Sequence, residues 1–249
     1  MIAPVVSLSE VWVTYRGGLG RPGIDAVKGA SLEISAGETL GLVGESGCGK
    51  STLGKVCLGL VRPSLGEMLF CGERFGHLRK RRGQLAVVLQ FPEWALNPRI
   101  PCGRSVEEPL VVLGVHPAQR RRRVEAMLQS VGLDGGFAER FPGQLSGGQR
   151  QRVAIARALI TEPRFIVFDE AVSALDVSVQ AQVLNLILDL QTQHGFGALF
   201  ISHDLAATRY LSRRIAVMRE GEIVEIGSRD QFYDRPEHPY SRSLPGAVS

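Results

Sequence analysis

The sequence predicts an α/β core interrupted by a helical segment. Short apolar runs, typical of buried strands, alternate with amphipathic helical patterns toward both ends of the 249-residue chain. Between them, a long stretch has mainly helical periodicity. The chain also contains 29 glycines, many in short clusters beside the apolar runs. Such clusters are expected where the backbone must approach a ligand closely, so they direct attention to phosphate-binding loops.

The first part of the chain reads as strands leading into one helix. Residues 5–15 alternate apolar and polar side chains, and residues 31–34 form a second strand pattern before a turn at 36–38. TLGLV, residues 39–43, is apolar throughout and predicts a buried strand. Helical spacing of apolar side chains then predicts a helix from Thr52 until Pro63 stops it.

The remaining elements follow in the same alternating order. Residues 105–141 are mostly helical in pattern, and residues 165–170 form a short apolar strand that ends in two acids. An apolar face over residues 179–190 marks a long helix. Residues 198–204 predict another strand, and residues 214–227 predict a hairpin that turns at Glu220-Gly221.

Composition excludes several classes of protein. With 44% hydrophobic and 22% charged residues the chain is not intrinsically disordered, and its net charge of +4 is too small to indicate nucleic-acid binding. The apolar runs fall short of the about 18 residues that a membrane span needs. The start, MIAPVVSLSE, lacks the features of a secretion signal. The four cysteines form no CxxC pair, which predicts reduced cytosolic thiols.

The segment GESGCGKST fits the phosphate-loop pattern G-x-x-x-x-G-K-[ST] between a buried strand and an amphipathic helix. The glycines allow backbone N–H groups to turn toward phosphates, the lysine neutralises the β and γ oxygens, and the serine hydroxyl reaches Mg²⁺. ATP or GTP binding is therefore expected. The predicted nucleotide-binding residues here are Gly44, Glu45, Ser46, Gly47, Cys48, Gly49, Lys50, Ser51 and Thr52.

Two acids end the strand FIVFDE. Asp169 is placed to hold Mg²⁺ opposite Ser51, and Glu170 to polarise the water that attacks the γ-phosphate. An apolar run ending in two acids is, taken alone, more often an ordinary strand end. The phosphate loop earlier in the chain favours the catalytic interpretation.

A second glycine-containing turn precedes RQRVAIARAL and opens a helix, which makes a further anion site. The simpler interpretation of this segment is an ordinary helix start after a glycine turn, with no anion bound. Together with the phosphate loop and the acidic strand, LSGGQ resembles the signature of ATP-binding cassette ATPases, and the resemblance spans nearly the whole chain. The resemblance implies that the signature residues contact the ATP bound by a partner cassette; they are Leu145, Ser146, Gly147, Gly148 and Gln149.

The resemblance implies a fold: a P-loop NTPase core of the RecA type with a mostly parallel sheet, an N-terminal antiparallel β subdomain and an inserted helical signature subdomain. One nucleotide-binding domain would fill residues 1–249, with its core at approximately 1–90 and 160–249 and its helical subdomain at approximately 91–159.

The resemblance also implies further site residues. Gln90 matches the glutamine that touches Mg²⁺ and signals to the membrane partner, and His203 matches the switch histidine at the γ-phosphate. Tyr15 resembles the aromatic that stacks on adenine, with Trp12 as the competing choice. The D-loop, which crosses between two cassettes, corresponds to Ser173, Ala174, Leu175 and Asp176. Catalysis would rest on Glu170, His203, Gln90 and Lys50, with Mg²⁺ held by Ser51, Gln90 and Asp169.

In this family two cassettes sandwich each ATP, and hydrolysis drives membrane subunits between inward-facing and outward-facing states. The implied cofactors are ATP and Mg²⁺. The implied partners are a second cassette (a paralogue or an identical chain), two separate permease subunits and an extracytoplasmic solute-binding protein. The expected location is peripheral, at the cytoplasmic face of the inner or plasma membrane.

Finer resemblance is to the ATPase subunits of bacterial oligopeptide, dipeptide and nickel importers, carried above all by the end motif RPEHPYSRSL. Two departures stand out: Gln144 replaces an acidic residue before LSGGQ, and Phe91-Pro92-Glu93-Trp94 replaces the usual Asp-Pro after Gln90. A cysteine-bearing tail found in many peptide-importer ATPases is missing, which leaves nickel or a metal chelate open as cargo beside peptides.

The alternative function is a repair or chromosome-maintenance ATPase of the same superfamily. The basic runs 79–82 and 120–123 would then contact nucleic acid. Solvated charge on a helix or loop explains such runs more simply. Repair ATPases also insert long coiled coils or zinc modules before the signature, and this sequence shows neither heptads nor zinc spacing there. No nucleic-acid partner is expected.

Overall fold

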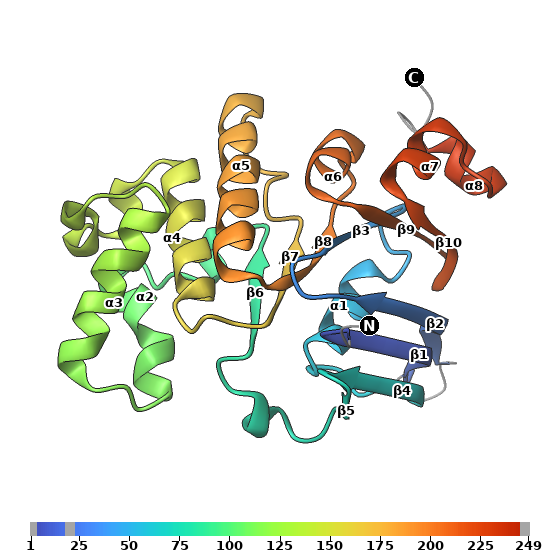
Figure 1. Cartoon of the computed structure of the whole chain (residues 1–249), viewed down its shortest axis with the longest axis horizontal. Helices are drawn as coiled ribbons and strands as arrows, with labels where there is room; N and C mark the ends of the chain where they lie inside the picture. The colour runs from blue at the N-terminus through green and yellow to red at the C-terminus, as the bar shows by residue number, and fades with distance from the viewer. Residues whose placement is uncertain (1–3, 18–22, 245–249) are drawn as a thin grey trace. The chain divides into compact units, whose positions relative to one another are not determined.

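The computed structural model describes residues 4–17 and 23–244 (Figure 1). The chain divides into two compact units, which are described separately: residues 1–80 with 197–249, and residues 81–196. The sequence-based division into a catalytic core and a helical subdomain at approximately 91–159 follows function, whereas these units follow compactness, so that division stays a prediction.

The first unit contains a four-stranded antiparallel sheet. Strand β1 pairs with β2 on one side and with β4 on the other, and β5 pairs with the outer side of β4. Val6 and Leu8 are buried, as are Val11 and Val13; a register shift between Leu8 and Val11, where Glu10 has φ of 49°, interrupts the simple alternation. The second strand begins well before the predicted residues 31–34. The strands are β1 (Val6–Tyr15), β2 (Ile24–Ile34), β4 (Leu65–Phe70) and β5 (Glu73–Arg74).

Four further strands of this unit pair with one another, and β3 among them leads into the phosphate loop. Strand β3 runs parallel to β8 and β9, while β10 pairs antiparallel with β9 in the predicted hairpin. Every residue of β3 and β8 is buried, which explains why both read as continuous apolar runs. The strands are β3 (Thr39–Val43), β8 (Gly197–Ile201), β9 (Arg214–Arg219) and β10 (Glu222–Ser228).

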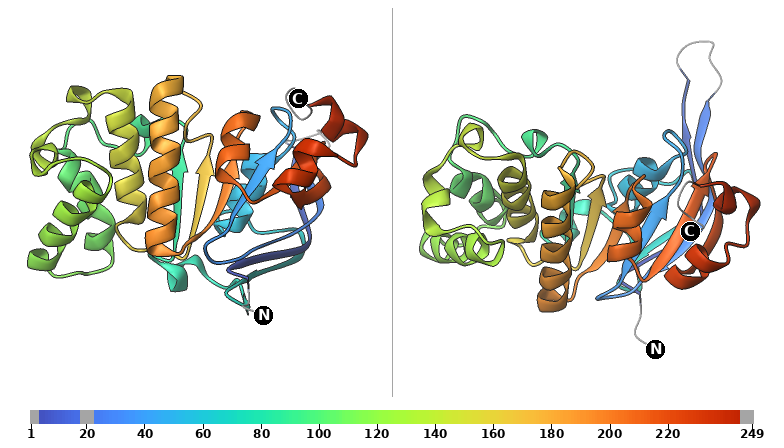
Figure 2. Two further views of the ribbon diagram at one scale, coloured as in Figure 1. Left: turned by 45° about the horizontal axis from the view of Figure 1, so that its top comes forward. Right: turned by 90° about the horizontal axis from the view of Figure 1, so that it is seen from above.

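Four helices complete the unit (Figure 2). Helix α1 packs against β1, β2 and β8, and α6 packs against β3. Helix α7 packs on β9 and β10, and α8 lies at the end of the described chain. These helices are α1 (Lys50–Cys57), α6 (Leu205–Leu211), α7 (Arg229–Asp234) and α8 (Pro239–Ser243).

Helix α1 ends six residues before the predicted stop at Pro63, so that expectation was wrong. The last helical residue is Cys57, and Gly59 adopts a left-handed backbone with φ of 67°. A Cβ atom on Gly59 would stand 2.0 Å from the ring of Phe75. The helix therefore ends in a glycine cap, in which the N–H groups of Gly59 and Leu60 donate to the carbonyl oxygens of Val56 and Lys55 at 2.7 and 2.9 Å, and apolar periodicity alone does not carry that information.

The second unit pairs strand β6 in parallel with β7 and adds helices (Figures 1 and 2). Helix α2 packs against α3 and α4, and α4 also contacts β6 and α5. Gly195, in the left-handed conformation with φ of 69°, caps the end of α5. These elements are β6 (Leu85–Leu89), β7 (Phe165–Asp169), α2 (Cys102–Val112), α3 (Pro117–Ser130), α4 (Gly147–Leu159) and α5 (Val177–His194).

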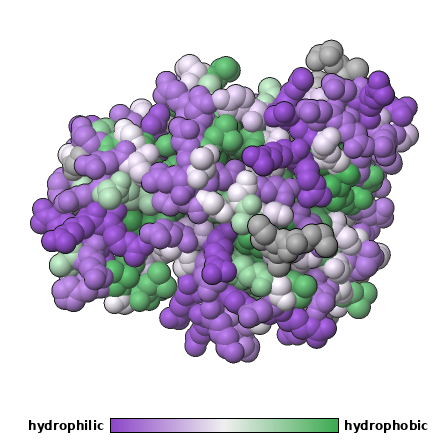
Figure 3. Space-filling model, in the orientation of Figure 1, coloured by the Kyte–Doolittle hydropathy of each residue, from purple (hydrophilic) through white to green (hydrophobic). Residues whose placement is uncertain are grey.

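Short 3₁₀ turns connect these elements: η1 (Leu78–Arg81), η2 (Pro92–Trp94), η3 (Gly135–Glu139) and η4 (Pro142–Gln144). The face of the molecule drawn in Figure 3 is largely hydrophilic, with apolar side chains in small patches. Within residues 4–17 and 23–244, no helix has the length and apolar character that crossing a membrane requires.

Candidate functional site

The phosphate loop connects β3 to α1, where the sequence places it. Gly44, Gly47 and Gly49 have φ of 148°, 82° and 109°, values that favour glycine. A Cβ on Gly44 would stand 2.0 Å from the carbonyl oxygen of Met218, and one on Gly49 2.2 Å from that of Ala26. Apart from Gly47 and its two chain neighbours, no described residue has an atom within 4 Å of the Cβ position of Gly47. Two glycines thus let the loop pack on the protein, and the third faces open space.

Lys50 is buried at the start of α1, with 6% of its surface exposed. Its Nζ donates to the carbonyl oxygens of Gly44 and Glu45 at 2.7 and 2.8 Å, and lies 3.8 Å from Cys48 Sγ. The ammonium group is therefore folded back over its own loop, where it is already oriented by main-chain oxygens.

The loop and the start of α1 fit a phosphate group. Among the described residues no side chain caps the first turn of α1, whose N-cap is Gly49, and the turn holds no acid. The N–H groups of a helix's first turn can receive an anion, and the helix dipole favours one. Ser51 is exposed in that turn, and hydroxyl and carboxylate oxygens are the ligands Mg²⁺ prefers. The residues present therefore suit a nucleotide with Mg²⁺.

In the second unit, Gln90, Asp169 and Glu170 come together at one strand edge. Leu89 of β6 lies opposite Asp169 of β7 in the parallel register, so Gln90 and Glu170 both follow directly from that pair. The carboxyl ends of parallel strands are where open α/β sheets place their ligands. The amide and the two carboxylates thus lie at one strand edge, and their roles toward Mg²⁺ and water stay a prediction.

Glu170 has an unusual backbone for a residue other than glycine, with φ of 52°. The turn that follows stabilises it, because Ser173 donates to the carbonyl oxygen of Glu170 through both its N–H, at 3.2 Å, and its hydroxyl, at 2.9 Å. Left-handed backbone at a non-glycine residue costs free energy and is concentrated at functional sites. The conformation is consistent with the predicted catalytic role of Glu170.

The signature segment begins α4 with a reciprocal cap. Ser146 Oγ accepts the N–H of Gln149 at 3.3 Å, and Gln149 Oε1 accepts the N–H of Ser146 at 3.0 Å. Arg150 Nη1 donates to the carbonyl oxygen of Leu145 at 2.9 Å. Leu145 is buried and Ser146 is exposed, so the segment presents its polar helix start to the outside, as binding of an anion would require.

The two signature glycines have different neighbours. A Cβ on Gly148 would lie 2.4 Å from Val179 Cγ1 at the start of α5, whereas one on Gly147 would lie 3.8 Å from Leu175 Cδ2, an ordinary contact. Leu175 belongs to the predicted D-loop, so the structure brings the signature and the D-loop residues together within the second unit. Gly148 is required by packing, and Gly147 leaves its surface open.

We expect Gly148→Ala to lower the free energy of unfolding by about 1–3 kcal/mol, because its methyl group overlaps the stiff side chain of Val179. The paired change Gly148→Ala with Val179→Ala should recover part of that loss. Gly147→Ala should leave the urea midpoint near that of the wild type. Equal destabilisation by the two single alanines would contradict the packing difference.

The remaining predicted residues lie where their strands end. His203 is exposed two residues after β8, and Asp204 caps α6 by accepting the N–H of Ala207 at 3.1 Å. Tyr15 ends β1 with 44% of its surface exposed. Trp12 is half-buried, with its indole nitrogen 3.5 Å from the Cβ position of Gly29. The stacking role of Tyr15 stays a prediction, and its greater exposure favours it over Trp12.

Gln144 has a local structural role. Its Oε1 accepts the N–H of Phe141 at 2.8 Å and closes the η4 turn just before the signature. A carboxylate at this position would accept the same bond, so the turn does not depend on the acidic residue common in the family.

The second basic run lies on α3 and is mostly paired with acids. Arg120 Nε lies 3.3 Å from Glu107, Arg121 Nε lies 3.2 Å from Glu125, and Arg123 Nη2 lies 3.2 Å from Glu162. Three of the four arginines at 120–123 therefore already have carboxylate partners, which supports the interpretation as a solvated helix face.

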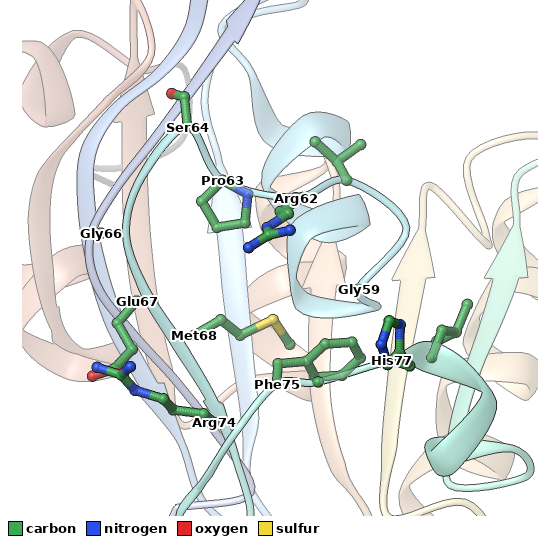
Figure 4. A pocket seen from close by; sticks show the side chains of 13 residues that line it. Gly59, Arg62, Pro63, Ser64, Gly66, Glu67, Met68, Arg74, Phe75 and His77 are labelled. Atoms are coloured by element: carbon green, nitrogen blue, oxygen red, sulfur yellow. The ribbon is translucent and has the colours of Figure 1, made fainter.

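A separate pocket of about 680 Å³ lies in the first unit beyond the end of α1 (Figure 4). Met68 and Phe75 line it, and Arg74 at its rim pairs with Glu67. None of the residues predicted to bind nucleotide is among those that line it.

The loop glycines, the buried lysine and the surrounding α/β fold define a P-loop nucleoside-triphosphatase. Residues 27–173 match the sequence family described as "ABC transporter". The chain belongs to this family of ATP-hydrolysing cassettes, whose cofactors are ATP and Mg²⁺.

Several named proteins are similar in sequence. The oligopeptide transport ATP-binding proteins OppF of Haemophilus influenzae and Bacillus subtilis are 46% and 45% identical over 90% and 97% of this chain, which covers 70% and 80% of them. The glutathione import ATP-binding protein GsiA of Pectobacterium atrosepticum is 48% identical over 90% of the chain. The chain spans only 37% of the length of that protein.

Solved structures confirm the fold. An ATP-binding cassette solved as a dimer in a post-hydrolysis state with ADP and Pi superposes with a TM-score of 0.78 at 31% identity, covering 90% of this chain and 98% of that one. The cbiO1 subunit from Clostridium perfringens, part of the cbiONQ transporter complex, gives a TM-score of 0.83 at 26% identity, covering 92% and 90%. These matches give no support to a nucleic-acid function.

Proposed function

We propose that this chain is the ATP-hydrolysing subunit of a bacterial importer whose cargo is peptides. The observation that carries the proposal is 45–48% identity over nine-tenths or more of the chain to ATP-binding proteins named for oligopeptide, peptide and glutathione import. Those names favour peptides over nickel or a metal chelate. The end motif HPYSRSL, carried by α8, supports the same subgroup.

The residues divide the chemistry among them. MgATP supplies the phosphoanhydride bond and a cation that offsets its charge. Lys50 and the loop N–H groups hold phosphate oxygens, and Glu170 accepts the proton of the attacking water. His203 orients the terminal phosphate, and Ser146 with the first N–H groups of α4 binds the nucleotide of a second cassette. Hydrolysis therefore requires two cassettes, either paralogues or identical chains.

The proposed assembly adds two permease subunits and an extracytoplasmic solute-binding protein, with the cassettes at the cytoplasmic face of the membrane. A contact for the permease follows Gln90. The rings of Phe91 and Trp94 pack with centroids 5.1 Å apart and planes tilted by 55°, and Trp94 is 73% exposed. Between them, Glu93 lies 3.6 Å from Arg150 Nε on the signature helix. This aromatic pair is thus connected to both Gln90 and the signature, as a transmitting contact requires.

The test is to tag the chain, solubilise native membranes gently and identify what co-purifies by mass spectrometry. Recovery of two permeases and a second cassette is the expected result. Trp94→Ala should lower permease recovery by about tenfold or more, because buried aromatic anchors dominate interfaces. Leu65→Ala, which alters a similarly exposed apolar side chain on β4, is the matched control. Recovery of nucleic acid or repair factors without membrane protein would overturn the proposal.

A further inference from the structure

The end motif of the chain contacts the phosphate loop. Tyr240 on α8 accepts, through its hydroxyl oxygen, the backbone N–H of Glu45 at 3.1 Å. The two residues are 195 positions apart in the sequence and belong to the same compact unit. This bond involves the main chain of the loop, so it depends on the loop's conformation and not on the identity of its side chains.

The bond completes a clamp on one peptide group. The carbonyl oxygen of Gly44 accepts from Lys50 Nζ at 2.7 Å, and the N–H on the other side of the same peptide donates to Tyr240. Hydrogen bonds at the two ends of a peptide polarise it and strengthen one another. Rotation of this peptide would break both bonds together. The hydroxyl of Tyr240 and the ammonium of Lys50 are therefore linked through the Gly44–Glu45 peptide.

We propose that Tyr240 is a positioning residue for the phosphate loop: it fixes the Gly44–Glu45 peptide and thereby keeps Lys50 and the loop in the conformation that receives the nucleotide's phosphates. Pre-organisation of this kind raises apparent affinity, because a site that is competent only part of the time binds more weakly by that fraction. The proposal concerns the ATPase and is independent of which cargo is transported.

The surroundings of Tyr240 hold its ring in place. Only 6% of the residue is exposed, and it belongs to a core cluster with Val43, the last residue of β3 before the loop. The other buried members are Ile215, Val217, Phe232 and Tyr233. The guanidinium of Arg219 lies 5.0 Å above the ring centroid. One cluster therefore packs against both the strand that enters the loop and the tyrosine that restrains it.

The backbone leading to Tyr240 is anchored as well. Glu225 on β10 accepts the N–H groups of Glu237 and His238, each at 3.0 Å, and His238 Nδ1 accepts the N–H of Tyr240 at 3.2 Å. Burial raises the pKa of Glu225. A hydrogen bond from Ser241, the two backbone bonds and the charge of the nearby His238 together lower it by more, so the pKa falls below its ordinary value. The carboxylate is therefore ionised near neutral pH, and the anchor is intact.

The hydroxyl of Tyr240 stays protonated near neutral pH. Burial raises the pKa of the phenol above its ordinary value; the bond from the Glu45 N–H lowers it, and the Glu45 carboxylate raises it further through its charge and a side-chain hydrogen bond. A neutral hydroxyl accepts the main-chain bond while retaining a proton of its own to donate.

The test removes only the hydroxyl. In purified protein, Tyr240→Phe should raise the Kd for MgADP, measured by calorimetry, roughly threefold to tenfold, the value of one hydrogen bond. In steady-state hydrolysis the KM for ATP should rise by a similar factor, while kcat at saturating ATP stays near the wild-type value. MgADP is used because it occupies the loop without turnover.

Tyr233→Phe is the matched control. Tyr233 is equally buried in the same cluster, and its hydroxyl donates to the carbonyl oxygen of Leu205, away from the loop. Both variants should lower the melting temperature by similar amounts, but only Tyr240→Phe should weaken the binding of MgADP. Wild-type affinity in Tyr240→Phe, or equal weakening in both variants, would overturn the proposal. Either outcome leaves the membrane co-purification test of import unaffected.

Discussion

Replacing Glu170 with glutamine is expected to lower the rate of ATP hydrolysis about 10²- to 10⁴-fold while nucleotide binding persists. The range is the contribution typical of a positioned general base. Glutamine preserves the shape of the side chain, but its amide does not take a proton from the attacking water. The measurement is phosphate release at saturating MgATP, compared with the Kd for MgADP from calorimetry.

The chain offers a close control for this change. Glu162 has φ of 54°, against 52° for Glu170, and also lies in the second unit, where it pairs with Arg123 at 3.2 Å. Glu162→Gln therefore repeats the substitution in a similar backbone conformation outside the predicted site. Its turnover should match the wild type. Substantial hydrolysis by Glu170→Gln would remove Glu170 from the catalytic role.

The sequence predicts those features that short segments determine. The position of the phosphate loop between β3 and α1 could be predicted, because a wholly buried strand and the start of a helix each leave a clear local pattern in the sequence. Ser146 caps α4 because serine with glutamine three residues later forms a reciprocal cap within four residues. The roles of these residues toward nucleotide remain predictions that the expected variants test.

Contacts between distant segments were not predictable in this way. The ring of Phe75 packs on Gly59 just past the end of α1, and nothing in the helical spacing before Pro63 signals that contact. The bond from Glu45 to Tyr240 joins residues 195 positions apart. The HPYSRSL motif was visible in the sequence, but as a mark of resemblance; only the fold shows that its tyrosine reaches the phosphate loop.

Replacing Lys50 with methionine is expected to weaken MgADP binding about 100-fold or more and to reduce ATP hydrolysis to background. Hydrogen bonds to charged groups contribute roughly 1.5–3 kcal/mol each, and the ammonium group serves more than one phosphate oxygen. Methionine keeps the apolar stem of this buried side chain, which limits any loss of packing. Calorimetry with MgADP measures the effect directly, and a melting curve reports whether the fold is retained.

Lys55→Met separates the role of Lys50 from a general loss of positive charge. Lys55 is exposed in the last turn of the same helix, five residues along α1, so this variant removes an equal charge from the same element. Its MgADP affinity should stay near the wild-type value.

Nζ of Lys50 already bonds to two carbonyl oxygens of its own loop, so its removal also frees the Gly44–Glu45 peptide that Tyr240 restrains. Tyr240→Phe should therefore weaken binding much less in the Lys50→Met background than in the wild type, because the clamp already lacks one side.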